Sequence, residues 1–170
     1  FLTRYRTAHW IRVPVMQRLL QTSMYEWVLY TDLDMMIVNW TIRLETFVAR
    51  ASPQTHIIFS DGDHLNSGAF LIRRSQWSIA FLDQWWMFGA RKTKFQFDQG
   101  PLGWLILSMA NRESGGRYQR DCEDSSLAHT RETCWNRWMV ELGFPLNHRR
   151  MRHILFWPCH GYQTSLRGFN

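Results

Sequence analysis

The segment from Trp27 to Asp34, Trp-Val-Leu-Tyr-Thr-Asp-Leu-Asp, constrains the fold most. Its apolar run is long enough for a buried strand and too short for a helix that stands alone. A parallel strand in an α/β sheet brings its last residues to the crevice where ligands bind. Two carboxylates there, Asp32 and Asp34, repel each other unless a cation lies between them. The segment therefore predicts a metal site at the end of a strand.

The composition is that of a globular chain with a basic surface. With 170 residues, 45% hydrophobic and 20% charged, we expect one globular domain over residues 1–170. The chain opens at Phe1 without a methionine, so we expect a fragment or a trimmed catalytic region. The net charge is +6, which suits an anionic ligand such as a nucleotide sugar, nucleic acid or a membrane surface, although a solvated basic surface explains it equally well. No stretch reaches the roughly 20 apolar residues that a membrane span needs.

Predicted strands alternate with predicted helices along the chain. Such alternation favours an α/β sandwich, and we expect a mixed, mostly parallel sheet. Polar loops are expected at 90–96 and 111–133. The expected elements are a helix from Trp10, a strand over 27–31, a short helix over 42–48, strands over 56–60 and 68–72, a helix capped by Ser75 and ended by Gly89, a helix capped by Asp98, a short helix over 134–142 and a strand over 154–157.

Asp32 and Asp34 are the candidate metal ligands. Side chains alternate along an extended segment, so the two carboxylates are expected on one side of it. Carboxylate oxygens suit a hard cation such as Mn²⁺ or Mg²⁺. The alternative is a pair of acids that caps turns at the end of a strand.

Two further groups of residues lie at the ends of predicted elements, Asn66-Ser67-Gly68 and Asp98-Gln99. Asn66 and Ser67 precede a strand and can bond sugar hydroxyls, while Gly68 permits the close approach of a ligand. An ordinary Asn-Ser-Gly turn is the alternative. Asp98 and Gln99 open a helix near its positive end and can contact an acceptor or a reacting sugar, or Asp98 can serve as a simple N-cap.

The last predicted strand leads to His160. Its imidazole can complete a metal shell, whereas a structural or exposed histidine is the other reading. Cys122 and Cys134 can close a loop in an oxidising compartment or remain free thiols. Asn39-Trp40-Thr41 is a glycosylation sequon, which matters only in a secretory protein.

The order of these motifs resembles one enzyme family. Asp-x-Asp at the end of a strand is followed by Leu-Asn-Ser-Gly-Ala-Phe-Leu-Ile-Arg with Ser-Gln-Trp-Ser after it, then by Asp-Gln and a late His. The sequence is similar to the retaining α-glycosyltransferases that include the yeast Golgi galactosyl- and mannosyltransferases and the plant xyloglucan xylosyltransferases. The match covers roughly 10–107 and is most distinctive over 65–77.

The resemblance implies a GT-A-like nucleotide-diphospho-sugar transferase fold, whose N-terminal strands should precede residue 1 and are expected to be missing from this chain. It also implies a UDP- or GDP-sugar donor and a glycan acceptor, with no nucleic acid partner, in a Golgi type II membrane protein whose anchor lies outside this chain. The family ending His-Phe-x-Gly-Cys appears here only as His160-Gly161-Tyr162. The residues that the resemblance assigns are Asp32, Asp34 and His160 to Mn²⁺, Asn66, Ser67 and Gly68 to the sugar, Asp98 and Gln99 to the reacting carbon, and Arg167 to a phosphate.

Two other functions remain open on the sequence alone. Phosphohydrolases of the haloacid dehalogenase type also end a strand in Asp-x-Asp, with the first acid as nucleophile, but a Gly-Thr normally follows where this chain has Met35 and Met36. A carbohydrate- or nucleic-acid-binding module, or an inactive relative of the transferases, would use the basic charge and the aromatic side chains for binding alone.

Overall fold

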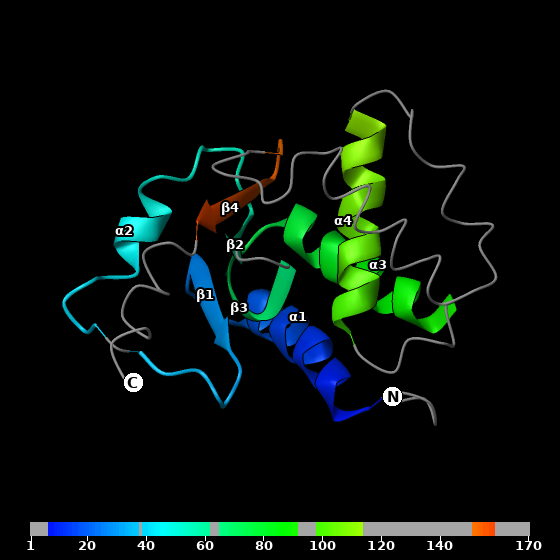
Figure 1. Cartoon of the computed structure of the whole chain (residues 1–170), viewed down its shortest axis with the longest axis horizontal. Helices are drawn as coiled ribbons and strands as arrows, with labels where there is room; N and C mark the ends of the chain where they lie inside the picture. Colours follow the sequence, from blue (N-terminus) through cyan, green and yellow to red (C-terminus); the bar gives the residue numbers. More distant parts are fainter. Residues whose placement is uncertain (1–6, 38, 62–64, 92–97, 114–150, 159–170) are drawn as a thin grey trace, which may run out of the picture.

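The computed structural model describes residues 7–37, 39–61, 65–91, 98–113 and 151–158. These residues form helices and strands in an alternating order (Figure 1). Most of the predicted elements are confirmed, including the strand at Trp27–Thr31. The elements are η1 (Ala8–Ile11), α1 (Arg12–Thr22), β1 (Trp27–Thr31), α2 (Glu45–Val48), β2 (Ile57–Asp61), β3 (Leu65–Arg73), α3 (Gln76–Arg91), α4 (Gln99–Glu113) and β4 (Ile154–Pro158).

The four strands form one mixed sheet in the order β1-β3-β2-β4. β3 is antiparallel to both of its neighbours, and only β2 and β4 run parallel. The expected mixed sheet is confirmed, but the expectation that it is mostly parallel is wrong. The short connection over 62–64 requires β2 and β3 to be antiparallel, whereas the antiparallel pairing of β1 with β3 joins strands that are distant in the sequence.

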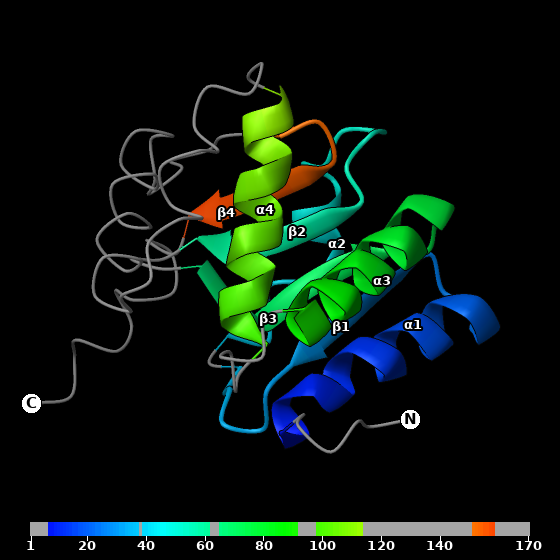
Figure 2. The same ribbon diagram turned by 90° about the vertical axis from the view of Figure 1, so that its right-hand side faces the viewer.

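The sheet is covered on both faces (Figure 2). α1, α3 and α4 pack on one face, where alternate strand residues such as Ile57, Phe59 and Ile72 join the main core. The residues between them, including Ile58 and Leu71, pack on the other face with side chains of α2. Each central strand is therefore buried on both faces, which explains its nearly continuous apolar sequence.

α3 begins where the sequence predicts and ends later. The Ser75 hydroxyl oxygen accepts the Ser78 N–H at 3.1 Å, which confirms the predicted cap. The prediction that Gly89 ends the helix is wrong, because α3 continues to Arg91. A Cβ atom on Gly89 would lie 1.9 Å from Cη2 of Trp10, so this glycine lets α3 approach the aromatic ring beside α1.

Two other boundaries differ from the sequence predictions. Leu65, Asn66 and Ser67 belong to β3 rather than to a preceding turn, and they alternate buried, exposed and buried as a strand does. α4 extends to Glu113, so the predicted polar loop over 111–133 begins too early. The short helix predicted over 134–142 lies outside the described residues. In the described part, no helix has both the length and the apolar character to span a membrane.

His56 lies in an aromatic cluster at the start of β2. Its ring stacks on Trp77 with the centroids 5.3 Å apart, and the ring of His153 lies 5.3 Å away on the β4 side. The Ser75 hydroxyl is 2.9 Å from His56 Nδ1. Burial lowers the pKa of His56, and the nearby charges of His153 and Arg73 lower it further.

We therefore expect the protein to lose stability as the pH falls below about 6.5. His56 takes up a proton more readily in the unfolded state, so the stabilisation by its neutral form is complete above the unfolded pKa and is lost as the pH falls toward the folded pKa. Melting temperatures measured between pH 7.5 and 5 should decline in the wild type and decline less in His56→Phe, which keeps the ring but cannot titrate. Equal slopes in the two proteins would contradict this role of His56.

Candidate functional site

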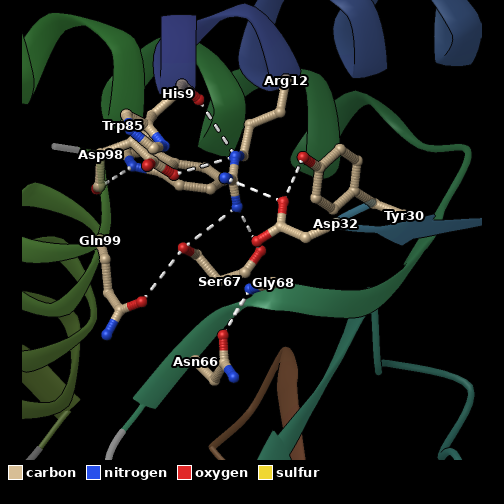
Figure 3. Close-up of polar contacts among 10 residues, drawn as sticks. All are labelled: His9, Arg12, Tyr30, Asp32, Asn66, Ser67, Gly68, Trp85, Asp98 and Gln99. Carbon is tan, nitrogen blue, oxygen red and sulfur yellow. Dashed lines mark hydrogen bonds and ion pairs between the residues drawn. The ribbon is translucent and has the colours of Figure 1, made fainter. Parts of the chain in front are cut away.

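A buried arginine lies at the centre of the candidate site (Figure 3). Arg12 is the first residue of α1, and only 5% of its surface is exposed. Its Nη1 donates to the backbone oxygen of Ser67 at 2.7 Å and its Nε donates to the backbone oxygen of His9 at 3.0 Å. The guanidinium also lies between two carboxylates, those of Asp32 and Asp98. A buried cation requires such partners, because burial removes its hydration.

Asp32 follows β1 directly. Its Oδ1 is 3.0 Å from Arg12 Nη2 and accepts the Tyr30 hydroxyl at 2.7 Å. Burial, with the hydrogen bond to Asp32, raises the pKa of Tyr30 to about 12, so the phenol stays protonated and keeps donating at physiological pH. The backbone N–H of Asp32 donates to the oxygen of Gly68 at 2.7 Å, which extends the contact between β1 and β3 beyond the ladder.

Gly68 lies against the Asp32 carboxylate. A Cβ atom at position 68 would lie 2.8 Å from Asp32 Oδ2 and 2.8 Å from Asn66 Oδ1. Asn66 is exposed and accepts the Gly68 N–H at 2.6 Å. Glycine therefore lets the Asp32 carboxylate and the Asn66 amide lie against the backbone of β3, and the close approach of a ligand to Gly68 stays a prediction.

Ser67 connects β3 to the start of α4. It is buried, and its hydroxyl accepts from Arg12 Nη1 at 3.2 Å and donates to Gln99 Oε1 at 3.4 Å. Gln99 is itself exposed, so its side chain is accessible from solvent. The structure thus brings together four of the predicted residues, Ser67, Gly68, Asp32 and Gln99.

Asp98 is buried immediately before α4. Its backbone oxygen accepts the Leu102 N–H at 3.1 Å, which places it at the predicted N-cap position, and the Trp85 indole N–H at 2.9 Å. Its Oδ2 is 3.2 Å from Arg12 Nε, whose single hydrogen is directed at His9. Burial raises the pKa of the Asp98 carboxyl, and the positive charge of Arg12 opposes the rise.

Asp34 is exposed and separated from this network. The carbonyl oxygen of Asp32 accepts the Met35 N–H at 3.2 Å, so the chain turns at Leu33 and Asp34 instead of staying extended. The alternation argument that placed both acids on one side is therefore wrong, and their joint role as ligands stays a prediction. Among the described residues, no three histidine, cysteine or acidic side chains are grouped to hold a metal ion. His160 and Arg167 lie outside those residues.

Sequence reasoning missed Arg12 and Tyr30. A signal for Arg12 was present, because it is flanked on α1 by the buried Val13 and Met16, and a cation on an apolar helix face needs buried partners. Tyr30 and Val28 are two residues apart, so their side chains lie on the same, helix-covered face of β1. The sequence does not show which group accepts the hydrogen bond of the Tyr30 hydroxyl.

Comparison with known proteins shows a family resemblance over part of the chain. Residues 45–113, which include β3 and α4, match the model of the galactosyl transferase GMA12/MNN10 family. The expected family resemblance is confirmed. The matched glycosyltransferase segment contains Ser67, Gly68, Asp98 and Gln99, whereas Arg12 and Asp32 lie before it.

Two rice proteins show the same relationship. The chain is 28% identical to Probable glycosyltransferase 3 of Oryza sativa subsp. japonica over 149 residues, which is 83% of this chain and 31% of that protein. It is 31% identical to Probable glycosyltransferase 7 of Oryza sativa subsp. indica over 98 residues, 52% of this chain and 22% of that protein. The chain therefore spans less than a third of the length of these relatives. No solved structure matches it.

Proposed function

We propose that the chain is part of a metal-dependent retaining glycosyltransferase that moves a hexosyl or pentosyl group from a nucleotide sugar to a glycan acceptor. The observation that carries this proposal is the convergence of the end of β1, the start of β3 and the start of α4 on Arg12. The family match, together with the names of the relatives, supports a glycosyltransferase. The Golgi lumen, which the resemblance implies, is part of the same proposal.

The available donor atoms fit a hard divalent cation such as Mn²⁺ or Mg²⁺. Asp32 offers Oδ2, which lies against Gly68, and Asp34 offers an exposed carboxylate. We assign both acids to the metal, with His160 as the third ligand. A bound divalent cation would neutralise the donor diphosphate and stabilise the charge that develops as it leaves.

The other residues would bind and orient the donor sugar. Asn66 is exposed next to Gly68, and Gln99 is exposed at the start of α4, so both side chains can bond sugar hydroxyls. In the proposed reaction the acceptor hydroxyl attacks the anomeric carbon on the face from which the diphosphate departs. The departing phosphate takes the proton of the attacking hydroxyl, so no carboxylate nucleophile is needed. Arg167 is proposed as a phosphate partner.

A donor-hydrolysis screen tests the proposal. The full-length protein is incubated with UDP- and GDP-sugars and Mn²⁺, with and without excess chelator. We expect hydrolysis of at least one donor that disappears with the chelator and returns when Mn²⁺ is added back. Binding of glycans or nucleic acid that weakens with salt and ignores Mn²⁺ would favour a binding module instead. Phosphate trapped on Asp32 would favour a phosphohydrolase.

A further inference from the structure

Resting on the proposed function, a further role follows for a residue outside the matched family segment. We propose that Arg12 is a positioning residue of the transfer site, which orients Asp32 so that one oxygen remains for a ligand and holds the start of α4 beside β3. The guanidinium is buried and does not itself face solvent. It therefore acts through the side chains that it contacts.

The first part of the argument is the orientation of Asp32. Arg12 and Tyr30 both use Oδ1 of this carboxylate, at 3.0 Å and 2.7 Å. The guanidinium also lies over the Tyr30 ring, 4.9 Å from its centroid, so the two donors support each other. With Oδ1 occupied twice, Oδ2 is the oxygen left beside Gly68. Arg12 thus holds the Asp32 side chain in one rotamer, in which Oδ2 alone would bind a metal ion.

The second part is charge balance between two elements. Asp32 and Asp98 come from β1 and from the start of α4, and one guanidinium pairs with both. Without it, two poorly solvated carboxylates would face each other and repel. The same guanidinium bonds the backbone and hydroxyl oxygens of Ser67, whose hydroxyl donates to Gln99. Arg12 therefore determines where the exposed Gln99 lies relative to Asp32.

Lysine cannot reproduce this arrangement. Arginine presents five donors in a rigid planar fork, whereas lysine offers one ammonium on a flexible stem. An ammonium can keep the positive charge near one carboxylate but cannot contact Asp32, Asp98 and Ser67 in the same way. Arg12→Lys thus keeps the positive charge of the residue and removes its planar set of hydrogen-bond donors.

The test compares three variants of the full-length protein: Arg12→Lys, Arg12→Met and, as the matched control, Arg18→Met at an exposed position of α1. For each we would measure the melting temperature, the binding of Mn²⁺ alone by electron paramagnetic resonance, and kcat and KM for donor hydrolysis. Arg12→Met leaves the buried Asp98 and the half-buried Asp32 without their cation, so Arg12→Lys carries the test if Arg12→Met does not fold.

We expect Arg12→Lys to lower kcat about 10- to 100-fold with KM changed less than about threefold, the size of effect seen when residues that orient ligands are lost. Mn²⁺ affinity should fall less than kcat does, because the carboxylates that would bind the cation remain while Asp32 is oriented less well. Arg18→Met should behave as the wild type.

Two results would overturn the inference. One is wild-type kcat in a folded Arg12→Lys variant. The other is a parallel fall in melting temperature, Mn²⁺ affinity and kcat, which would show a structural role alone. A wild-type protein that neither binds Mn²⁺ nor hydrolyses any donor would instead refute the proposed function, so the two failures are distinguishable.

Discussion

Asp34→Asn is expected to lower Mn²⁺-dependent sugar transfer by about a thousandfold or more and to leave the melting temperature unchanged. Asp34 is exposed in the turn after β1, so its carboxylate can be removed without disturbing the core. In the proposed role, the loss of this charged metal ligand would remove several kcal/mol of stabilisation from the departing diphosphate, and about 1.4 kcal/mol corresponds to a factor of ten in rate.

Asp34 gives a cleaner test than Asp32. Replacing Asp32 would also remove the ion pair with Arg12 and the acceptor of the Tyr30 hydroxyl, so stability and activity would change together. Glu45→Gln, at an exposed position of α2, makes the same change in charge and serves as the control. Steady-state transfer rates and thermal unfolding would be measured for both variants. Wild-type transfer by Asp34→Asn would refute its role as a ligand.

The second large effect is expected at Gly89, where alanine should destabilise the protein by about 3 kcal/mol. In an exposed helix the same change would stabilise by up to about 1 kcal/mol, because alanine is the better helix former. Here the new Cβ would lie 1.9 Å from the ring of Trp10. That ring is 1% exposed and meets Trp86 edge to face at 6.0 Å, so it cannot move aside cheaply.

A double-mutant cycle isolates this contact. Trp10→Leu removes the ring atoms that the Cβ of Gly89→Ala would meet, so the second substitution should cost much less in that background. Free energies of unfolding from denaturant titration would be compared for the wild type, both single variants and the double variant. Additive effects would show that the close approach of α3 to Trp10 is not the cause.

The sequence predicts most elements of this fold because each carries a local signal. β1 is an apolar run bounded by polar residues, and α3 combines the Ser75 cap with aromatic residues at helical spacing. Strand direction is not local: β1 pairs with β3, whose position depends on the whole hydrophobic core. The sequence therefore predicts a mixed sheet correctly, but it predicts mostly parallel pairs where two of the three described pairs are antiparallel.

The candidate site likewise contains residues that the sequence predicts and residues that only the folded structure reveals. Ser67, Gly68, Asp98 and Gln99 stand out because polar groups at the ends of elements are visible in the sequence, and the structure brings them together. Arg12 was missed because Asp32, Ser67 and Asp98, which its guanidinium contacts, lie 20 or more positions away along the chain, so only the folded arrangement reveals these contacts. The turn at Asp34 was missed because alternation was extended beyond the last residue of β1.

The strand order also determines which fragments of the chain are expected to stay soluble. A fragment trimmed to the matched segment 45–113 would keep β2 and β3 but lose both outer strands, β1 and β4. The remaining pair of strands, β2 and β3, is rich in Ile and Phe and would then have unpaired backbone groups along each of its two outer edges. Such edges favour edge-to-edge aggregation. It would also lack Arg12 and Asp32. Poor solubility of such a fragment would thus report the missing outer strands rather than an unstable enzyme.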